Sequence, residues 1–407
     1  MHLKPQIVMK KIKAYMRGVF EVYCREFKII LHDPGVILFI TFLPLVYPII
    51  YSLIYNPELV KEVPMVIVDH DRTSRSRELT RRLDACDEVW VRGYAADMGE
   101  ARRAMDSHKC FSILEIPEGY ARNIGKGEVA TAALYCDMTL LLRYRGFLVA
   151  ATEVAQELGS EIQTEDVNRL APLAGTIMTG DLLPIENISM GNIRNGFDSF
   201  IMPGVLVLIL HQCIVLAMGM LGGARRERRS LIGYNPHNNA RSVSATMLGQ
   251  SLCMMTCMSL FVIYMLHYVP LMFKFPMAGN LGEELLFILP MMLACLGLGF
   301  VFQAFVTERE SVFVSWVVTS VILLMLSGLI WPHYDMPKAW RLLADIFPST
   351  WGVEGYIKMN ANGASLAQVR HEYVMLWILA AAWLAIGYVV QKWVVRPKAA
   401  AVAAAQS

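Results

Sequence analysis

Six uncharged, largely apolar runs divide the chain, and they are unevenly spaced. Each is long enough for a helix to cross the hydrocarbon core of a bilayer, which takes roughly 20 residues. Charge-free runs are favoured there because a Lys or Asp at the bilayer centre costs about 3 kcal/mol. The runs are Gly35–Tyr55, Phe200–Leu221, Val243–Phe273, Leu285–Thr307, Ser311–Tyr334 and Tyr373–Gln391. The pattern predicts an α-helical polytopic membrane protein with six transmembrane helices in a 1+5 layout.

The long insert between the first two runs, residues 56–199, has the composition of a soluble domain. Strand-like apolar stretches cover 63–71, 88–94, 110–117 and 128–136. Helical patterns cover 73–85, 97–108, 118–124 and 139–170. Alternating strands and helices favour one compact α/β domain.

Composition and charge agree with a membrane location. Mean hydropathy is +0.43, and charged residues make up only 18%, below the roughly 25% of soluble domains. Basic residues gather on one predicted side of the membrane: Lys4, Lys10, Lys11, Lys13, Arg17, Arg25, Lys28, Arg225, Arg226, Arg228, Arg229, Arg241, Arg309, Lys392, Arg396 and Lys398. The short loops of the other side carry Lys274, Lys338, Arg341, Lys358 and Arg370. By the positive-inside rule both termini are expected to be cytoplasmic and the insert extracytoplasmic, and nothing indicates nucleic acid binding.

These patterns define the expected domains. A cytoplasmic amphipathic connector helix occupies 1–34, the first membrane helix 35–55 and the extracytoplasmic α/β domain 56–199. A five-helix bundle follows over 200–395, with helices near 200–221, 244–268, 285–307, 311–331 and 373–392. Residues 396–407 form a cytoplasmic tail.

Motifs for chemistry are sparse. The closest approach to a nucleotide-binding loop is Gly119–Gly125–Lys126, but its spacing is one residue too long and Gly127 replaces the Ser or Thr that holds magnesium. No metal-ligand set or catalytic constellation is evident, so an enzyme is not expected. No Asp, Glu, Lys or Arg lies in mid-span, as an ion-coupled transporter usually requires. Any transport would therefore need another energy source.

Three cysteines fall in the insert, where disulfides can form. Because the number is odd and no spacing resembles a zinc site, free thiols are expected for Cys86, Cys110 and Cys136. One disulfide is the alternative, with Cys86 and Cys110 as the pair to test first.

Several segments, in order along the chain, resemble one family. They are REFKIILHDPGVILFITFLPLVYPIIY (25–51), VIVDHD and the Ser and Leu residues after it (66–79), EARRAM (100–105), ILEIPEGYARNIGKGE (113–128), RERRSLIGYNP followed by LGQ, and SGLIWPHYDMPKAWRLLADIFPSTWGVEGY (327–356). Together they resemble the ABC-2 type permeases, and most closely the multidrug-export branch with a large extracytoplasmic domain. Arg229, Ser230 and Gln250 depart from the residues usual in that family.

The resemblance implies the permease subunit of an ATP-binding cassette exporter. A separate ATPase would bind ATP and magnesium, so no cofactor is expected on this chain. In such exporters cytoplasmic helices of the permease dock into the ATPase, which makes helix 6–30 and loop 222–241 docking candidates. The coupling candidates are Arg225, Arg226, Glu227, Arg228, Arg229, Glu308 and Arg309. Membrane anchoring by the basic residues alone is the alternative.

The same resemblance implies a multi-pass protein of the bacterial inner membrane that exports a small amphipathic or hydrophobic substrate. A second permease copy or close paralogue is the expected dimer partner, and a periplasmic adaptor is a further candidate partner. Polar side chains within spans nominate His211, Gln212, Trp316 and Thr319 for the translocation path, with packing between helices as the alternative. Trp316 and Thr319 also fit a dimer interface, with packing against lipid or the bundle as the alternative. A membrane receptor with a ligand-binding insert is the alternative function, although its inner segments are short for an output module.

Overall fold

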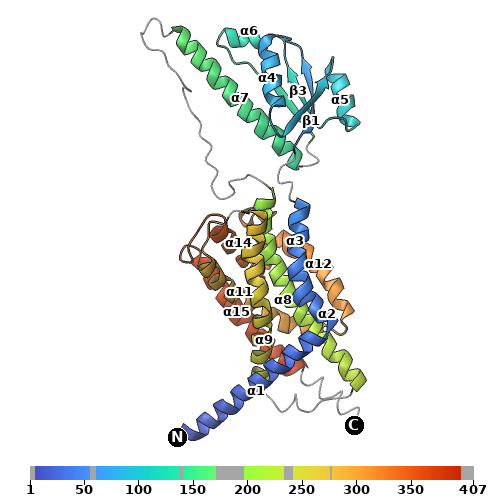
Figure 1. The fold of residues 1–407 in the computed structure, drawn as a ribbon, viewed down its shortest axis with the longest axis vertical. Helices are drawn as coiled ribbons and strands as arrows, with labels where there is room; N and C mark the ends of the chain where they lie inside the picture. The colour runs from blue at the N-terminus through green and yellow to red at the C-terminus, as the bar shows by residue number, and fades with distance from the viewer. Residues whose placement is uncertain are drawn as a thin grey trace. The chain divides into compact units, whose positions relative to one another are not determined.

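The computed structural model describes residues 5–55, 61–137, 141–170, 197–232, 242–275 and 277–395 (Figure 1). The chain divides into two compact units. We call residues 1–56 and 189–407 the bundle unit, and residues 57–188 the insert unit.

The bundle unit is helical. Its helices are α1 (Pro5–His32), α2 (Pro34–Ile37), α3 (Leu43–Tyr55), α8 (Phe197–Ile232), α9 (Val243–Ile263), α10 (Val269–Phe273), α11 (Leu281–Phe305), α12 (Glu310–Leu326), α13 (Lys338–Ala344), α14 (Pro348–Asn360) and α15 (Arg370–Val390). Short π-helical turns at Leu38–Phe42, Tyr264–Tyr268 and Gln391–Val395 continue α2, α9 and α15.

Five helical segments of the described residues are long and apolar enough to cross a membrane. They are Pro34–Ile54, Phe197–Glu227, Val243–Phe273, Leu281–Phe305 and Arg370–Val395. The predicted span over 311–331 is helical only to Leu326, and α12 has 17 residues. Gly328, at φ +85°, redirects the chain just beyond it, in a conformation that favours glycine. The structure thus agrees with a polytopic helical protein, and the described residues leave the exact count of six spans unconfirmed.

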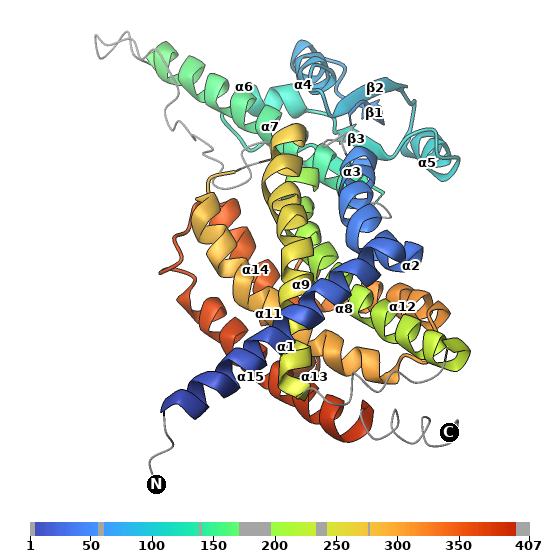
Figure 2. The same ribbon diagram turned by 60° about the horizontal axis from the view of Figure 1, so that its bottom comes forward.

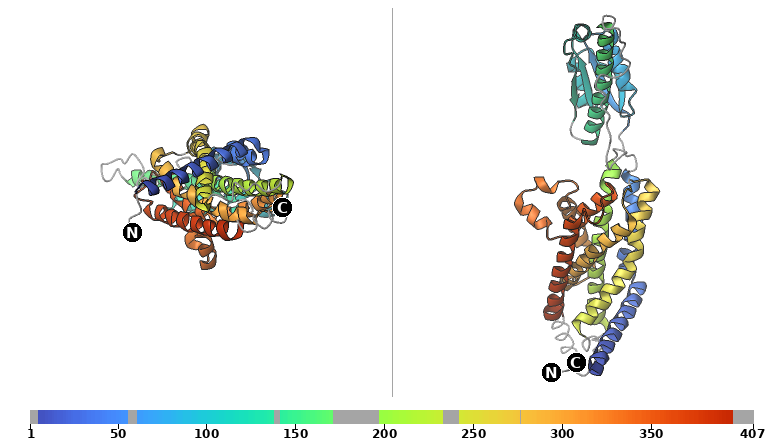
Figure 3. Two further views of the ribbon diagram at one scale, coloured as in Figure 1. Left: turned by 90° about the horizontal axis from the view of Figure 1, so that it is seen from below. Right: turned by 90° about the vertical axis from the view of Figure 1, so that its left-hand side faces the viewer.

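Helix α8 occupies the centre of the bundle and is the most buried of the five segments (Figures 2 and 3). Around it, small residues allow close helix packing, as is common in membranes. A Cβ on Gly297 of α11 would lie 2.6 Å from the backbone nitrogen of Leu384 on α15, so only glycine fits this contact. The α11–α15 pair therefore depends on a residue without a side chain.

A proline in the third span is compensated by a hydroxyl from a distant helix. Pro270 has no N–H to donate to the carbonyl of Leu266, one helical turn earlier. The hydroxyl of the fully buried Tyr356 on α14 donates to that carbonyl at 3.2 Å. Such replacement partners are needed where no water can reach the backbone. The sequence pattern did not predict α13 or α14, which lie between α12 and α15.

The insert unit is a four-stranded sheet in the order β2-β1-β3-β4, with helices on both faces. Its strands are β1 (Val63–Asp69), β2 (Val89–Tyr94), β3 (Ser112–Ile116) and β4 (Ala133–Cys136). Its helices are α4 (Ser74–Asp84), α5 (Met98–Asp106), α6 (Tyr120–Gly125) and α7 (Leu141–Leu170). Strands β2, β1 and β3 are parallel and β4 is antiparallel to β3.

Alternate side chains of β1 belong to two separate hydrophobic cores, one on each face of the sheet. Met65 and Ile67 pack with α4 and α7, whereas Val66 and Val68 pack with α5. Successive strand residues point to opposite faces, which explains the division. Cys86 packs on the first face and Cys110 on the second, so the sheet separates the pair considered for a disulfide. All eight cysteines are free.

Phe147 anchors α7 on the sheet, because it is fully buried in the α4–α7 core. Phe147→Ala should lower the local stability of the insert unit by about 3–5 kcal/mol, the usual cost of such a cavity. Hydrogen exchange of peptides covering β1 and β3 would measure it. Leu148→Ala, at an exposed neighbouring position, is the control. Equal exchange in both variants would contradict this account of α7.

Candidate functional site

Helices α1 and α9 cross (Figures 1 and 2). A buried carboxylate, that of Glu26 on α1, lies at their contact. Val19, Val22, Glu26 and Ile30 form the buried stripe of α1, and Glu26 is only 1% exposed. Arg225 on α8 contacts Glu26 with Nη2 2.5 Å from Oε2. Gln250 on α9 donates to its other oxygen at 3.3 Å. A single carboxylate thereby joins three helices.

The pKa of Glu26 reflects two opposing effects. Burial raises it, but the positive charges of Arg225 and Arg25, with hydrogen bonds from Arg225 and Gln250, outweigh burial and hold it below the ordinary value of 4.5. Glu26 is therefore an anion at neutral pH.

A second set of ionic contacts lies beside the first. Arg309, in the turn between α11 and α12, contacts Asp33 with Nη1 3.0 Å from Oδ1. Its Nε lies 2.8 Å from Oε2 of Glu227, and its backbone N–H donates to Oε1 of Glu227 at 2.9 Å. Asp33 also caps α2 by accepting from the backbone of Gly35 and Val36. We call the combined set the basal network: Glu26, Asp33, Arg225, Glu227, Gln250, Gln303 and Arg309.

Glycines bring the backbones close enough for these contacts. A Cβ on Gly223 of α8 would lie 3.1 Å from the backbone nitrogen of Arg309. Arg225 Nη1 lies 3.5 Å from Oε1 of Gln303, and Arg226 donates to the carbonyl of Ala304 at 2.8 Å. The end of α8 is therefore fastened to α1, to α11 and to the turn before α12.

The residues that the sequence suggested for coupling to an ATPase have different surroundings in the structure. Arg225, Glu227 and Arg309 meet in the basal network, while Arg226 bonds the end of α11. Glu308 is exposed at the surface of the same turn. The side chains of Arg228 and Arg229 lie outside the described residues.

Sequence reasoning missed Glu26, Asp33 and Gln303. One signal was available for Glu26, because an acidic residue occupies the apolar stripe of an amphipathic helix. A buried acid is costly unless it is paired, so its position already indicated a cationic partner. Nothing in the sequence indicated which arginine this would be.

The translocation-path candidates gather around a second feature. His211, Gln212 and Thr319 line a cavity of about 130 Å³ between α8, α11 and α12. Trp316 donates from its indole N–H to Oε1 of Gln212 at 3.0 Å. The Nδ1 atom of the buried His211 has no hydrogen-bond partner among the described residues. The candidates therefore lie together around one small cavity within the bundle.

The acidic motif of the insert serves local structure. Asp71 accepts hydrogen bonds from the hydroxyl of Thr73 and from the backbone of Gly119 and Ala121. Asp69 accepts from the hydroxyl of Ser76 at 2.7 Å. These bonds fix the loops around α4 and α6. Among the described residues, no group of three or more His, Cys, Asp or Glu side chains is placed to hold a metal ion.

Comparison with known protein families gives a match over most of the chain. The family model described as "ABC-2 family transporter protein" matches residues 34–389, most of the chain. No curated protein matches the chain.

The basal network predicts strong coupling between Glu26 and Arg225. Arg225→Met should destabilise the bundle by roughly 3 kcal/mol, because it leaves the buried Glu26 with less compensation, and Glu26→Met in the same chain should recover part of the loss. Thermal unfolding of the single and double variants would give the coupling energy. Arg17→Met, which breaks an exposed pair with Glu21, is the control and should cost under about 1 kcal/mol. Additive single-variant effects would contradict the pairing.

The same variant should change the pH dependence of stability. Without Arg225, two of the effects that lower the pKa of Glu26 are lost, and burial, the largest single effect, should shift this pKa upward. A raised carboxyl pKa stabilises the fold at low pH and loses that effect as pH rises through the pKa. Arg225→Met should therefore be closer to the wild-type chain at pH 4 than at pH 7.5 in melting experiments. An equal deficit at both pH values would count against a charged Glu26.

Proposed function

This chain belongs to the ABC-2 transporter family, and we propose that it is the permease subunit of an exporter driven by a separate ATPase. Family membership supports a multi-pass membrane protein that takes part in transport. We further propose that it lies in a bacterial inner membrane with both termini in the cytoplasm. It would move a small amphipathic or hydrophobic substrate outward and pair with a second permease copy.

The observation that carries this proposal is the basal network. It fastens α1 to α8 and α9, and it fastens the turn before α12 to α8, through buried or half-buried charges. Because breaking buried pairs is costly, the helix ends are held together rather than free to slide separately. A force applied to α1 or to this turn would therefore reach α8 at the centre of the bundle. This is the property that a permease coupled to a motor subunit requires.

Accessible groups for docking lie around the network. Glu308 is exposed, and one face of α1 exposes Ile12, Met16 and Phe20. We propose that the ATPase contacts Glu308 and the end of α8, while the basal network itself transmits the movement. No nucleotide or magnesium would then be bound by this chain.

Docking can be tested by co-expressing the chain with a candidate ATP-binding cassette subunit and measuring how much of that ATPase co-purifies. Glu308→Lys should reduce the retained ATPase by roughly threefold or more, since reversing a rim charge opposes association. Lys338→Glu, an exposed charge on α13, is the control and should retain it fully. If the wild-type chain retains no ATPase and vesicles move no drug of a broad panel with ATP, the exporter proposal fails.

The cavity lined by His211, Gln212 and Thr319 is our candidate for part of the path. Thr319→Phe should fill this small space and abolish most ATP-driven drug transport, while ATPase binding persists. Transport into inverted vesicles would measure the effect. Val318→Phe, at an exposed position that does not line the cavity, is the matched control. Equal transport by both variants would exclude the cavity from the path.

A further inference from the structure

The insert unit contains a large apolar hollow between its sheet and α7. Its volume is about 650 Å³, within the range of about 300–1,000 Å³ typical of small-molecule sites. Buried Leu79, Leu83 and Leu114 form its floor. Tyr120 and Ile124 of α6, loop residues 127–132 and one side of α7 surround it.

Small residues on α7 keep the hollow open. Ala151, Ala155 and Gly159 follow at intervals of four, which places them on one side of the helix, and all three line the hollow. A Cβ on Gly159 would meet no atom within 4 Å. Gly159 is therefore not required for close packing against a neighbour. A larger side chain at this position would extend into the hollow.

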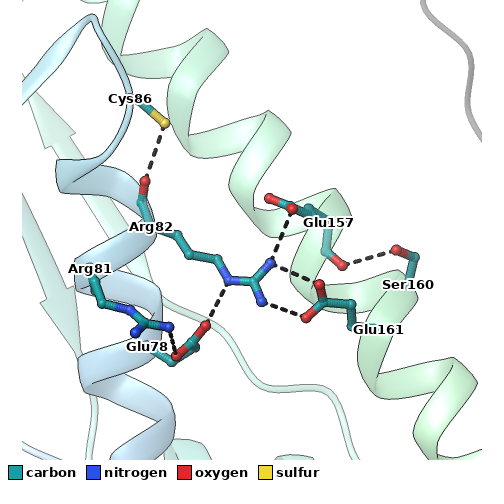
Figure 4. Close-up of polar contacts among 7 residues, drawn as sticks. All are labelled: Glu78, Arg81, Arg82, Cys86, Glu157, Ser160 and Glu161. Carbon is teal, nitrogen blue, oxygen red and sulfur yellow. Dashed lines mark hydrogen bonds and ion pairs between the residues drawn. The ribbon is translucent and has the colours of Figure 1, made fainter.

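Charged side chains hold α7 in this position (Figure 4). Arg82 of α4 contacts Glu161 with Nη2 2.5 Å from Oε2, and contacts Glu157 with Nη1 3.2 Å from Oε1. Glu78 on α4 accepts from Nε of Arg82 at 2.8 Å and steadies the guanidinium. Glu157 and Glu161 each lie two residues from Gly159, which places them on roughly the opposite side of the helix. These ion pairs of Arg82 hold α7 against α4, and none of their side chains lines the hollow.

The charge of the lining indicates the ligand class. Among the described residues that line the hollow, Glu128 is the one that carries a charge, and Thr131, Gln163 and the hydroxyl of Tyr120 are the other polar side-chain groups. A carboxylate and an aromatic ring both attract cations, whereas none of the described lining residues has a positive charge to balance an anion. We propose that the hollow binds a small hydrophobic monocation, with Glu128 facing its charge. This binding site is independent of the direction and energy source of transport.

The test uses the full chain in lipid nanodiscs and equilibrium dialysis with tetraphenylphosphonium, after subtraction of empty nanodiscs. Gly159→Phe should abolish saturable binding, because the ring occupies the hollow. Gln156→Phe adds the same ring at an exposed position on α7 outside the lining and should bind as the wild-type chain does. Tetraphenylborate, an anion of nearly the same shape, should show no saturable binding.

Glu128→Gln tests the charge without changing the apolar walls. It should weaken tetraphenylphosphonium binding about threefold, as expected for an ion pair with the exposed Glu128. Unchanged binding by Gly159→Phe would overturn the location of the site. Equal binding of the cation and the anion, or an unchanged affinity in Glu128→Gln, would overturn the assigned ligand class.

Discussion

The ion pair between Glu26 and Arg225 organises the end of the bundle to which α1 binds. A carboxylate that is 1% exposed is stable as an anion only with close positive charge and hydrogen-bond donors. Those groups come from α8 and α9. If α1 moved away from these helices, Glu26 and Arg225 would lose their pairing. The neighbouring contacts of Arg309 with Asp33 and Glu227 extend the same constraint to the turn before α12. The association of helices remote in sequence thus depends on a few charges.

Backbone chemistry imposes a second constraint inside the bundle. Prolines and glycines occur in its helices. A proline leaves a backbone carbonyl without its usual N–H donor, and a glycine allows a neighbouring backbone to approach closely. Pro270 frees a carbonyl that the Tyr356 hydroxyl satisfies, and Gly297 admits the α15 backbone. In hydrocarbon such compensation must come from the protein itself. This explains why α14, a helix with many buried residues between α12 and α15, belongs to the bundle rather than to a loop.

The insert unit follows different rules, since it folds as a sheet with helices on both faces. Asp69 and Asp71 fix its loops through hydrogen bonds. Glu161 holds α7 against α4 through its ion pair with Arg82. Its α4–α7 side combines a tight core around Phe147 with an open hollow near Gly159. A rigid domain with unfilled apolar space is suited to binding, whatever movement the bundle performs.

The sequence alone determined the membrane character, the position of the α/β insert and the family, because hydropathy, strand alternation and ordered motifs are local properties of the chain. Boundaries were less certain: the run near 311–331 gave a helix that ends at Leu326, and β4 begins at Ala133 within a longer apolar stretch. Only the tertiary structure decided that Arg225 pairs with Glu26, and that Asp33 meets Arg309. Those pairings join residues about 200 or more positions apart, and their partners are selected by helix packing and by the cost of a buried charge. The hollow beside Gly159 could not be predicted from the sequence either. A glycine in a helix can lie against a close neighbour or beside open space, and the sequence does not distinguish the two.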